Sequence, residues 1–315
     1  MKTTTPPPPG QGPIRHSIYL RPGMGVKTWA GSTVSQVLPQ PAHLQGVKRG
    51  TVKGFSRKAA NRLRNLLFPL DYQGAFGIAL TAPPWYTVAP EKAFDLLSKS
   101  KARCPGLRAL IWRKEVTAKG LPHYHAIVFP EHPGNPVELL AVQRWVLDQW
   151  ATALLPRMCP VRVGLCCKAR SLPGDTATAR EMVRRINGGK DNLTLITSPT
   201  AVQYLCDHTS KHKAYQAKTT GRAWGVWFKD RLPRVVVDRR SLDELPVRVA
   251  RRIHKALGKM SRYWVKDAKA PFGYRWSHPR RFDGLGSRVL FRPASADALL
   301  RLVRYHLGEP ACAPS

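Results

Sequence analysis

Acidic residues are scarce in this chain of 315 residues. There are 19 Asp and Glu residues against 52 Lys and Arg, a formal net charge of +33. Such an excess of one sign repels itself and attracts polyanions. The basic residues are spread along the whole chain and are interleaved with aromatic residues, as in "GRAWGVWFKDR" and "GYRWSHPRRF". This distribution favours nucleic acid over a membrane surface as the partner.

Several other features are missing. No C-x-x-C pair occurs among the six cysteines, and the adjacent Cys166 and Cys167 suit neither a zinc ribbon nor a secreted disulfide framework. The N-terminus "MKTTTPPPPGQGPIRH" lacks the apolar segment of a signal peptide, and no apolar run approaches membrane-spanning length. "GGKD" at Gly188 lacks the flanking residues of an ATP-binding phosphate loop. The cysteine pattern and the lack of a signal peptide and of a membrane-spanning run predict a cytoplasmic protein with no membrane contact.

The composition changes along the chain and suggests three parts. Residues 1–45, rich in Pro, Gly, Thr and Gln, are predicted to be a largely disordered tail. Residues 46–230 alternate between helix and strand patterns and predict the main domain. Residues 231–315 form a basic C-terminal extension for DNA binding or dimerisation. In it, Ser241–Glu244 resembles a capping box before a helix that ends at Gly258, and residues 295–308 predict a last helix.

The main domain is predicted to begin with a helix capped by Ser56, with Ala60, Leu63 and Leu67 facing inward. Its outer face is either a phosphate-contacting stripe or an ordinary solvated face. The basic residues on that face are Arg57, Lys58, Arg62 and Arg64.

The next elements follow from hydrophobic periodicity. "GAFGIALTAPPW" predicts a strand, and "PEKAFDLLSKSKA" a helix with Ala93, Leu96 and Leu97 inward. Residues 107–129 predict a β-hairpin that turns near Lys119. "PVELLAVQRWVLDQWATALL" predicts an amphipathic helix packed on the sheet. After a less regular stretch, a helix starts at Ser198, and "RAWGVWF" and "RVVV" predict short strands.

The stretch "GLPHYHAIVFP" places two histidines in an apolar run. A buried strand is the predicted structure, so His123 and His125 point to one face while Tyr124 points to the other. Two neutral imidazoles on one face can bind a metal ion. A histidine on a strand is otherwise a packed, hydrogen-bonded residue.

Glu115 is a third candidate ligand if the hairpin loop has the right parity. With an odd-numbered loop centred on Lys119 or Gly120, Glu115 lies across from His123 or His125. With a two-residue loop it faces Tyr124 and the idea fails. In the first case the mixed nitrogen and oxygen donors suit Mg²⁺ or Mn²⁺. The alternative for Glu115 is a salt bridge with a neighbouring Arg or Lys.

The segment "QYLCDHTSKHK" carries a candidate nucleophile. On a helix, Tyr204, His208 and Lys211 share one face. An ammonium favours phenolate and stabilises charge on a nearby phosphate. A tyrosine on a helix is more commonly a core or interface residue. Tyr215, three turns on, is a weaker candidate.

Three motifs then resemble, in order and spacing, those of the HUH endonucleases. They are "IALTAPP" (residues 78–84), Glu115 with "HYH", and "YLCDHTSKHK", the likeness spanning roughly residues 55–228. The chain resembles single-tyrosine rolling-circle replication initiators of small plasmids and filamentous phages. It departs from many members because Asp207 stands three residues after the tyrosine, so the active-site lysine is either Lys211 or Lys213. His208 stands where some members have a second tyrosine.

The resemblance implies an α/β (α+β) domain, with helices packed behind an antiparallel sheet that carries the metal site on its central strands. Glu115, His123 and His125 would hold one Mg²⁺ or Mn²⁺, and Tyr204 would form a 5′-phosphotyrosine link to single-stranded or hairpin origin DNA. Lys213 and Arg222 would contact the DNA, and Trp224, Trp227 and Phe228 would stack on bases or belong to the core. The implied partners are a bacterial host's helicase and polymerase and, transiently, a second protomer. The alternatives are an HUH transposase or relaxase and a non-catalytic basic DNA-binding protein.

Overall fold

The computed structural model describes the greater part of the chain. The described residues are 14–21, 25–32, 55, 57–83, 86, 88–116, 122–155, 176–189, 192–197, 202, 222–260, 263–266, 274–277, 286–290 and 293–306. The chain divides into two compact units. Unit 1 comprises Met1–Arg49, Asn61–Pro69 and Val236–Ser315, and unit 2 comprises Gly50–Ala60 and Leu70–Val235. Both units mix helices with antiparallel sheets, as the α/β prediction requires.

Unit 2 is built on a five-stranded sheet in the order β6-β3-β5-β4-β7, and every described pairing in it is antiparallel. Its strands are β3 (Phe76–Thr81), β4 (Leu107–Val116), β5 (Pro122–Pro130), β6 (Leu193–Leu195) and β7 (Trp224–Trp227). The strand with the two histidines, β5, therefore lies in the middle. Gly225 of β7 lies opposite Trp112, where an added Cβ would approach the indole ring to 2.8 Å, so only glycine fits.

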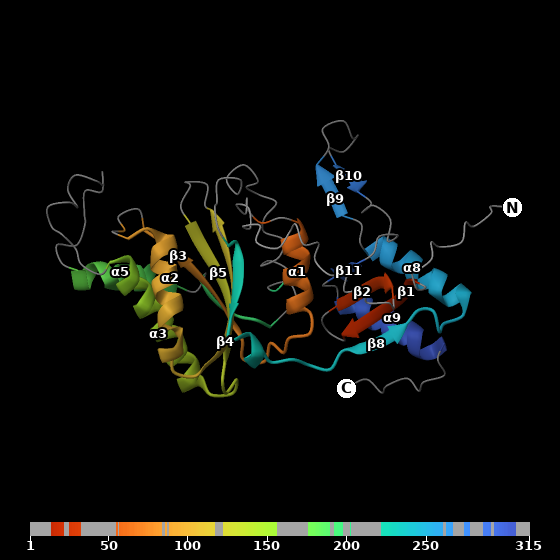
Figure 1. The fold of residues 1–315 in the computed structure, drawn as a ribbon, viewed down its shortest axis with the longest axis horizontal. Coiled ribbons are helices and arrows are strands. Elements are labelled where there is room, and N and C mark those ends of the chain that lie inside the picture. The colour runs from red at the N-terminus through yellow and green to blue at the C-terminus, as the bar shows by residue number, and fades with distance from the viewer. Residues whose placement is uncertain are drawn as a thin grey trace, which may run out of the picture. The chain divides into compact units, whose positions relative to one another are not determined.

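Three helices cover one face of this sheet: α2 (Pro90–Ser100), α3 (Pro136–Leu154) and α5 (Thr176–Gly188) (Figure 1). Their apolar side chains pack against Tyr124 and the other residues of that face. The Phe94 ring of α2 stacks on the Tyr124 ring at 4.0 Å between centroids, and Trp150 of α3 is fully buried. The packing of the amphipathic helix on the sheet is confirmed.

The helix prediction needs two corrections here. Leu96 is 42% exposed, so its predicted inward position is wrong. Helix α2 buries Pro90, Ala93, Phe94 and Leu97, a stripe that leaves Leu96 on the outer flank. Helix α5 falls in the stretch whose pattern is less regular, and the sequence did not predict it.

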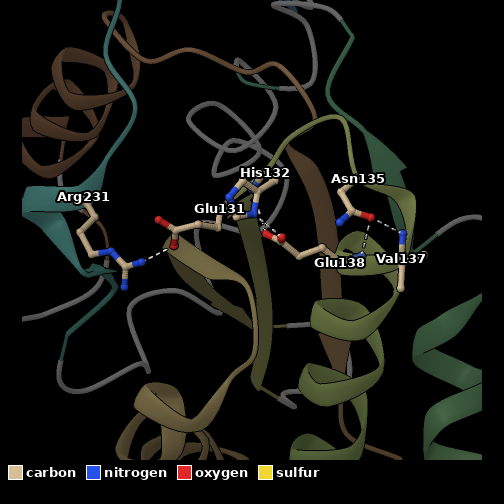
Figure 2. Close-up of polar contacts among 6 residues, drawn as sticks. All are labelled: Glu131, His132, Asn135, Val137, Glu138 and Arg231. Atoms are coloured by element: carbon tan, nitrogen blue, oxygen red, sulfur yellow. Dashed lines mark hydrogen bonds and ion pairs between the residues drawn. The ribbon is translucent and has the colours of Figure 1, made fainter.

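The C-terminal end of β5 is followed by a group of polar contacts around the start of α3 (Figure 2). Asn135 caps α3 by accepting hydrogen bonds from the backbone N–H groups of Val137 and Glu138. Glu138 accepts hydrogen bonds from the His132 backbone N–H at 2.9 Å and pairs with the His132 ring at 2.6 Å. Arg231, in the short helix η4 (Lys229–Arg231), pairs with Glu131. The hydrogen bonds of His132 lower the pKa of Glu138 although burial alone would raise it.

Unit 1 contains a four-stranded sheet in the order β11-β2-β1-β8. Its strands are β1 (Ile14–Arg21), β2 (Gly25–Ser32), β8 (Asp238–Ser241) and β11 (Gly286–Leu290). Ile18 and Leu20 of β1 are fully buried in a core with residues of α8 (Val247–Met260) and α9 (Pro293–His306). Strands β9 (Tyr263–Lys266) and β10 (Tyr274–Ser277) pair with each other.

The prediction of a largely disordered tail is wrong for residues 14–21 and 25–32. The amino-acid composition suggested disorder because it reflects only the residues within the segment itself. Strands β1 and β2 are instead ordered by pairing with strands from the C-terminal part of the chain. Strand β1 pairs with β8, and β2 pairs with β11. N-terminal and C-terminal segments thus share one sheet within unit 1.

Of the other predicted elements, some are confirmed and others begin or end at different residues. Helix α1 (Arg57–Leu67) forms as predicted, with Ala60, Leu63 and Leu67 buried. The capping box is wrong because Ser241 belongs to β8, where it pairs with Ser17. Helix α8 instead starts after Pro246, whose carbonyl accepts the first helical hydrogen bonds, and continues past Gly258 to Met260. In "RVVV" only Arg234 forms an isolated bridge, and the strand begins at Asp238.

Candidate active site

The register of the β4–β5 hairpin decides the face of Glu115. Glu115 pairs with His123 and Arg113 pairs with His125, while Lys114 pairs with Tyr124. Because Val116 pairs with Pro122, residues 117–121 connect the strands, an odd number centred on residue 119. The odd-loop alternative is therefore the correct one. Directly paired residues share a face of the sheet, so Glu115 and both histidines lie together.

The three side chains lie near one another on this face. The rings of His123 and His125 are 4.3 Å apart between centroids and nearly perpendicular, at 80°. Glu115 Oε2 lies 3.5 Å from His125 Nε2. The side chains of Glu115 and His125 are 9% and 15% exposed, so both are largely shielded from bulk water. The cluster Glu115–His123–His125 is called the histidine cluster below.

A buried asparagine holds the neighbouring strand against this cluster. The Thr81 hydroxyl, on β3 opposite His123, lies 2.8 Å from His123 Nδ1. The Asn187 side chain of α5 accepts a hydrogen bond from the Thr81 N–H at 2.6 Å and donates to the Thr81 carbonyl at 3.1 Å. Asn187 is fully buried. The contact fixes Thr81 and, through it, the orientation of the His123 ring, as outer groups do for metal-binding histidines.

Sequence reasoning missed the role of Asn187. Thr81 belongs to the motif "IALTAPP", but no sequence pattern linked it to Asn187, which lies 106 positions later in the chain. The only local signal was an asparagine on the buried side of a helix, since Ala179 and Val183 precede it at helical spacing and are also fully buried. A buried amide of this kind needs partners, and the backbone of Thr81 supplies them.

Arg113 is the other charged residue of the site. Its side chain is 0% exposed, with the Nη2 atom 3.0 Å from Glu115 Oε1. Its guanidinium lies 4.4 Å from the centroid of the Phe55 ring, a cation–π contact. Glu115 therefore forms the salt bridge with a neighbouring Arg that was the alternative prediction, and its carboxylate also lies close to His125. Glu115 is shared between the Arg113 guanidinium and the imidazole of His125.

The donor set suits a divalent cation in its chemistry. Two cis ligands of an octahedral Mg²⁺ at about 2.1 Å from the ion are about 3 Å apart, close to the distance between Glu115 and His125. Within the described residues, however, no group of three or more His, Cys, Asp and Glu side chains is arranged to hold a metal ion. Glu115 and the histidines would have to close further around an ion, with the carboxylate also in contact with Arg113.

Tyr124 is excluded as a nucleophile, although it lies between the two histidines in sequence. Its side chain is 2% exposed on the opposite face, stacked on Phe94. Burial, together with the charges of Glu91 and Asp95, raises the pKa of its phenol far above the ordinary value. Tyr124 is therefore held in the core and is not available to react.

Other predicted site residues differ in what the structure says of them. Tyr204, His208, Lys211, Lys213 and Tyr215 lie outside the described residues, as do the side chains of Arg57 and Lys58. Arg62 and Arg222 are exposed, and Arg64 is partly buried and donates to the Asn61 side chain at 3.0 Å. Trp227 is 2% exposed and belongs to the core, so it cannot stack on a base. Trp224 and Phe228 are partly exposed.

Comparison of this chain with protein-family models, with curated proteins and with solved structures finds no match. The described helices include none that is both long and apolar enough to cross a membrane.

Proposed function

We propose that this protein is a metal-dependent endonuclease that nicks and rejoins single-stranded DNA and so starts rolling-circle replication. The observation that carries the proposal is the meeting of Glu115, His123 and His125 on one face of the two central strands. Two imidazoles and a carboxylate are donor groups that a divalent cation can use. The net charge of +33 supports a polyanionic substrate.

The proposed roles follow from the chemistry of the side chains. A divalent cation held by the histidine cluster would supply Lewis-acid polarisation of the scissile phosphodiester. The Tyr204 oxygen attacks phosphorus, loses its proton to solvent and forms a 5′-phosphotyrosine bond. The bond to the 3′ oxygen breaks, and that oxygen takes up a proton to give a free 3′-OH. Lys211 or Lys213 stabilises the phenolate or the phosphate. The 3′-OH reverses these steps when the strand is rejoined.

The substrate and the partners are part of the same proposal. A base-paired, stacked backbone would not reach a single metal site freely, so the nick falls in single-stranded or hairpin origin DNA in the cytoplasm of a bacterial host. The free 3′-OH primes a host polymerase, and a host helicase supplies unwinding. A single tyrosine needs a second protomer or a second cycle to end replication, which makes transient dimerisation part of the hypothesis. Arg62, Arg222 and the basic residues near Tyr204 would contact the DNA backbone.

The first test is formation of a covalent complex. Wild type, Tyr204→Phe and His125→Ala are incubated with labelled single-stranded origin DNA and Mn²⁺ and run on a denaturing protein gel. A shifted band is expected only for wild type, with Tyr305→Phe, an exposed tyrosine of α9, as the matched control that keeps it. A band that survives in Tyr204→Phe would move the nucleophile elsewhere, and Tyr215→Phe would be tested next.

A second test needs no knowledge of the origin. Addition of Mn²⁺ is expected to raise the unfolding temperature of wild type because a ligand that binds only the folded state stabilises it. The shift should vanish in Glu115→Ala and His125→Ala and remain in His132→Ala, a histidine outside the cluster. Equal shifts in all four proteins would remove the metal site from the proposal.

The salt bridge of Arg113 favours a second candidate, a non-catalytic DNA-binding protein. A buried guanidinium 3.0 Å from Glu115 already gives the carboxylate a counter-charge, and such a pair serves structure without a metal. In that case DNA binding would persist in wild type, no covalent band would form on any candidate origin, and Mn²⁺ would leave the unfolding temperature unchanged.

A further inference from the structure

Helix α8 of unit 1 carries a concentrated basic surface. Arg248, Arg251, Arg252 and Lys255 are all exposed, and the helix contains no Asp or Glu. At 100° per residue these four positions fall within one arc of about 100°, and at 1.5 Å per residue they span about 10 Å along the axis. Among the described residues no side-chain hydrogen bond or ion pair engages any of the four. They are called the α8 stripe below.

The opposite side of α8 is already used by the core. Val249 is 3% exposed and Ile253 is 0% exposed. Both pack with Ile18 and Leu20 of β1 and with apolar residues of α9. The apolar face of the helix is therefore buried within unit 1, and only the basic flank is offered to a partner.

This arrangement decides between polyanionic partners. An amphipathic helix that binds a lipid surface inserts its apolar face among the acyl chains, and here that face is occupied. Single-strand binding depends on aromatic side chains that stack on bases, and the α8 stripe has none. A row of guanidinium and ammonium groups on a rigid helix fits the regularly spaced phosphates of a duplex, of which each strand presents about three over about 10 Å.

We propose that the α8 stripe binds the backbone of double-stranded DNA without regard to sequence. Arg and Lys contacts to phosphate position a protein on the duplex, whereas sequence is read through base edges. The α8 stripe belongs to unit 1 and the histidine cluster to unit 2, and the assignment of the stripe does not rest on the nicking activity proposed above. It gives the chain a way to hold duplex DNA in addition to any single-stranded substrate.

The test compares two variants with the same loss of charge. One carries Arg248→Gln, Arg251→Gln and Arg252→Gln. The control carries Lys92→Gln, Lys99→Gln and Arg103→Gln, three exposed cations of unit 2. The dissociation constant for a short blunt duplex of arbitrary sequence and for its single strand is measured by fluorescence anisotropy over a range of KCl concentrations. Binding to phosphatidylserine vesicles is measured in parallel.

The stripe variant is expected to bind duplex at least about tenfold more weakly and to lower the slope of log K against log [salt] by about 3, close to 0.9 for each phosphate contact. The control should keep most of the wild-type affinity and slope. Replacing the same three arginines with lysine should restore duplex binding, which separates the loss of charge from a loss of folding.

Three results would overturn the proposal. Equal losses in the stripe variant and the control would reduce the effect to net charge. Equal losses on duplex and single strand would remove the duplex assignment, and a loss of vesicle binding alone would point to a lipid surface. A covalent band formed by the stripe variant on single-stranded DNA would show that nicking and duplex binding are separate, so that either one can fail without the other.

Discussion

Replacing Arg113 with methionine removes the guanidinium that lies 3.0 Å from Glu115 on the buried side of β4. The side chains of the pair are 0% and 9% exposed, so the carboxylate loses a charged partner where water does not replace it well. Removal of one member of a buried ion pair costs about 3–5 kcal/mol, and the cation–π contact with Phe55 adds about 1 kcal/mol. Packing by the methionine side chain offsets part of this, so we expect a loss of about 3 kcal/mol in the free energy of unfolding.

The assay is urea unfolding followed by far-ultraviolet circular dichroism at neutral pH. The double variant Arg113→Met, Glu115→Met should recover about 2 kcal/mol relative to Arg113→Met alone, because it removes both charges and leaves apolar groups in their place. The control is Arg185→Met, whose partner Glu181 is also exposed, and it should cost less than about 1 kcal/mol. The reasoning fails if Arg113→Met costs no more than Arg185→Met, or if the double variant is less stable than Arg113→Met.

Three further predictions concern Asn187, Glu138 and Cys104. Asn187→Ala should cost about 1–3 kcal/mol in unfolding free energy because the Thr81 backbone loses its hydrogen-bond partners. Asn187→Asp should also be less stable than wild type, since a carboxylate cannot donate to the Thr81 carbonyl. Chemical denaturation measures both losses. The folded-state pKa of Glu138 is lowered, so its contribution to stability is present above the unfolded pKa of about 4.3 and is lost as the pH falls through the folded-state pKa. A scan of unfolding temperature from neutral to acid pH should therefore show less acid sensitivity in Glu138→Gln than in wild type. An unchanged profile in the variant would contradict the assignment. Burial raises the pKa of the Cys104 thiol to about 12, so iodoacetamide at mildly alkaline pH should modify this cysteine in urea but not in the folded protein. Peptide mass spectrometry measures the modification. Labelling of the folded protein at the rate of the unfolded chain would refute the burial.

The amino-acid sequence by itself determined the local elements of unit 2. Alternation fixed the face shared by His123 and His125, and the amphipathic period fixed α1 and α3, because both signals depend on neighbours a few residues apart. The sequence also limited Glu115 to two alternatives through the parity of the hairpin loop. These are short-range properties, and they need no knowledge of the rest of the chain.

Only the tertiary structure decided the contacts between distant segments. The register Glu115–His123 selected one parity, and the hydrogen bonds of Asn187 to Thr81 joined residues 106 positions apart. Strands β1 and β2 formed in a Pro- and Gly-rich region because β8 and β11 supply their hydrogen-bond partners. Backbone pairing and core packing are satisfied by groups far apart in sequence, so composition and local period cannot specify them.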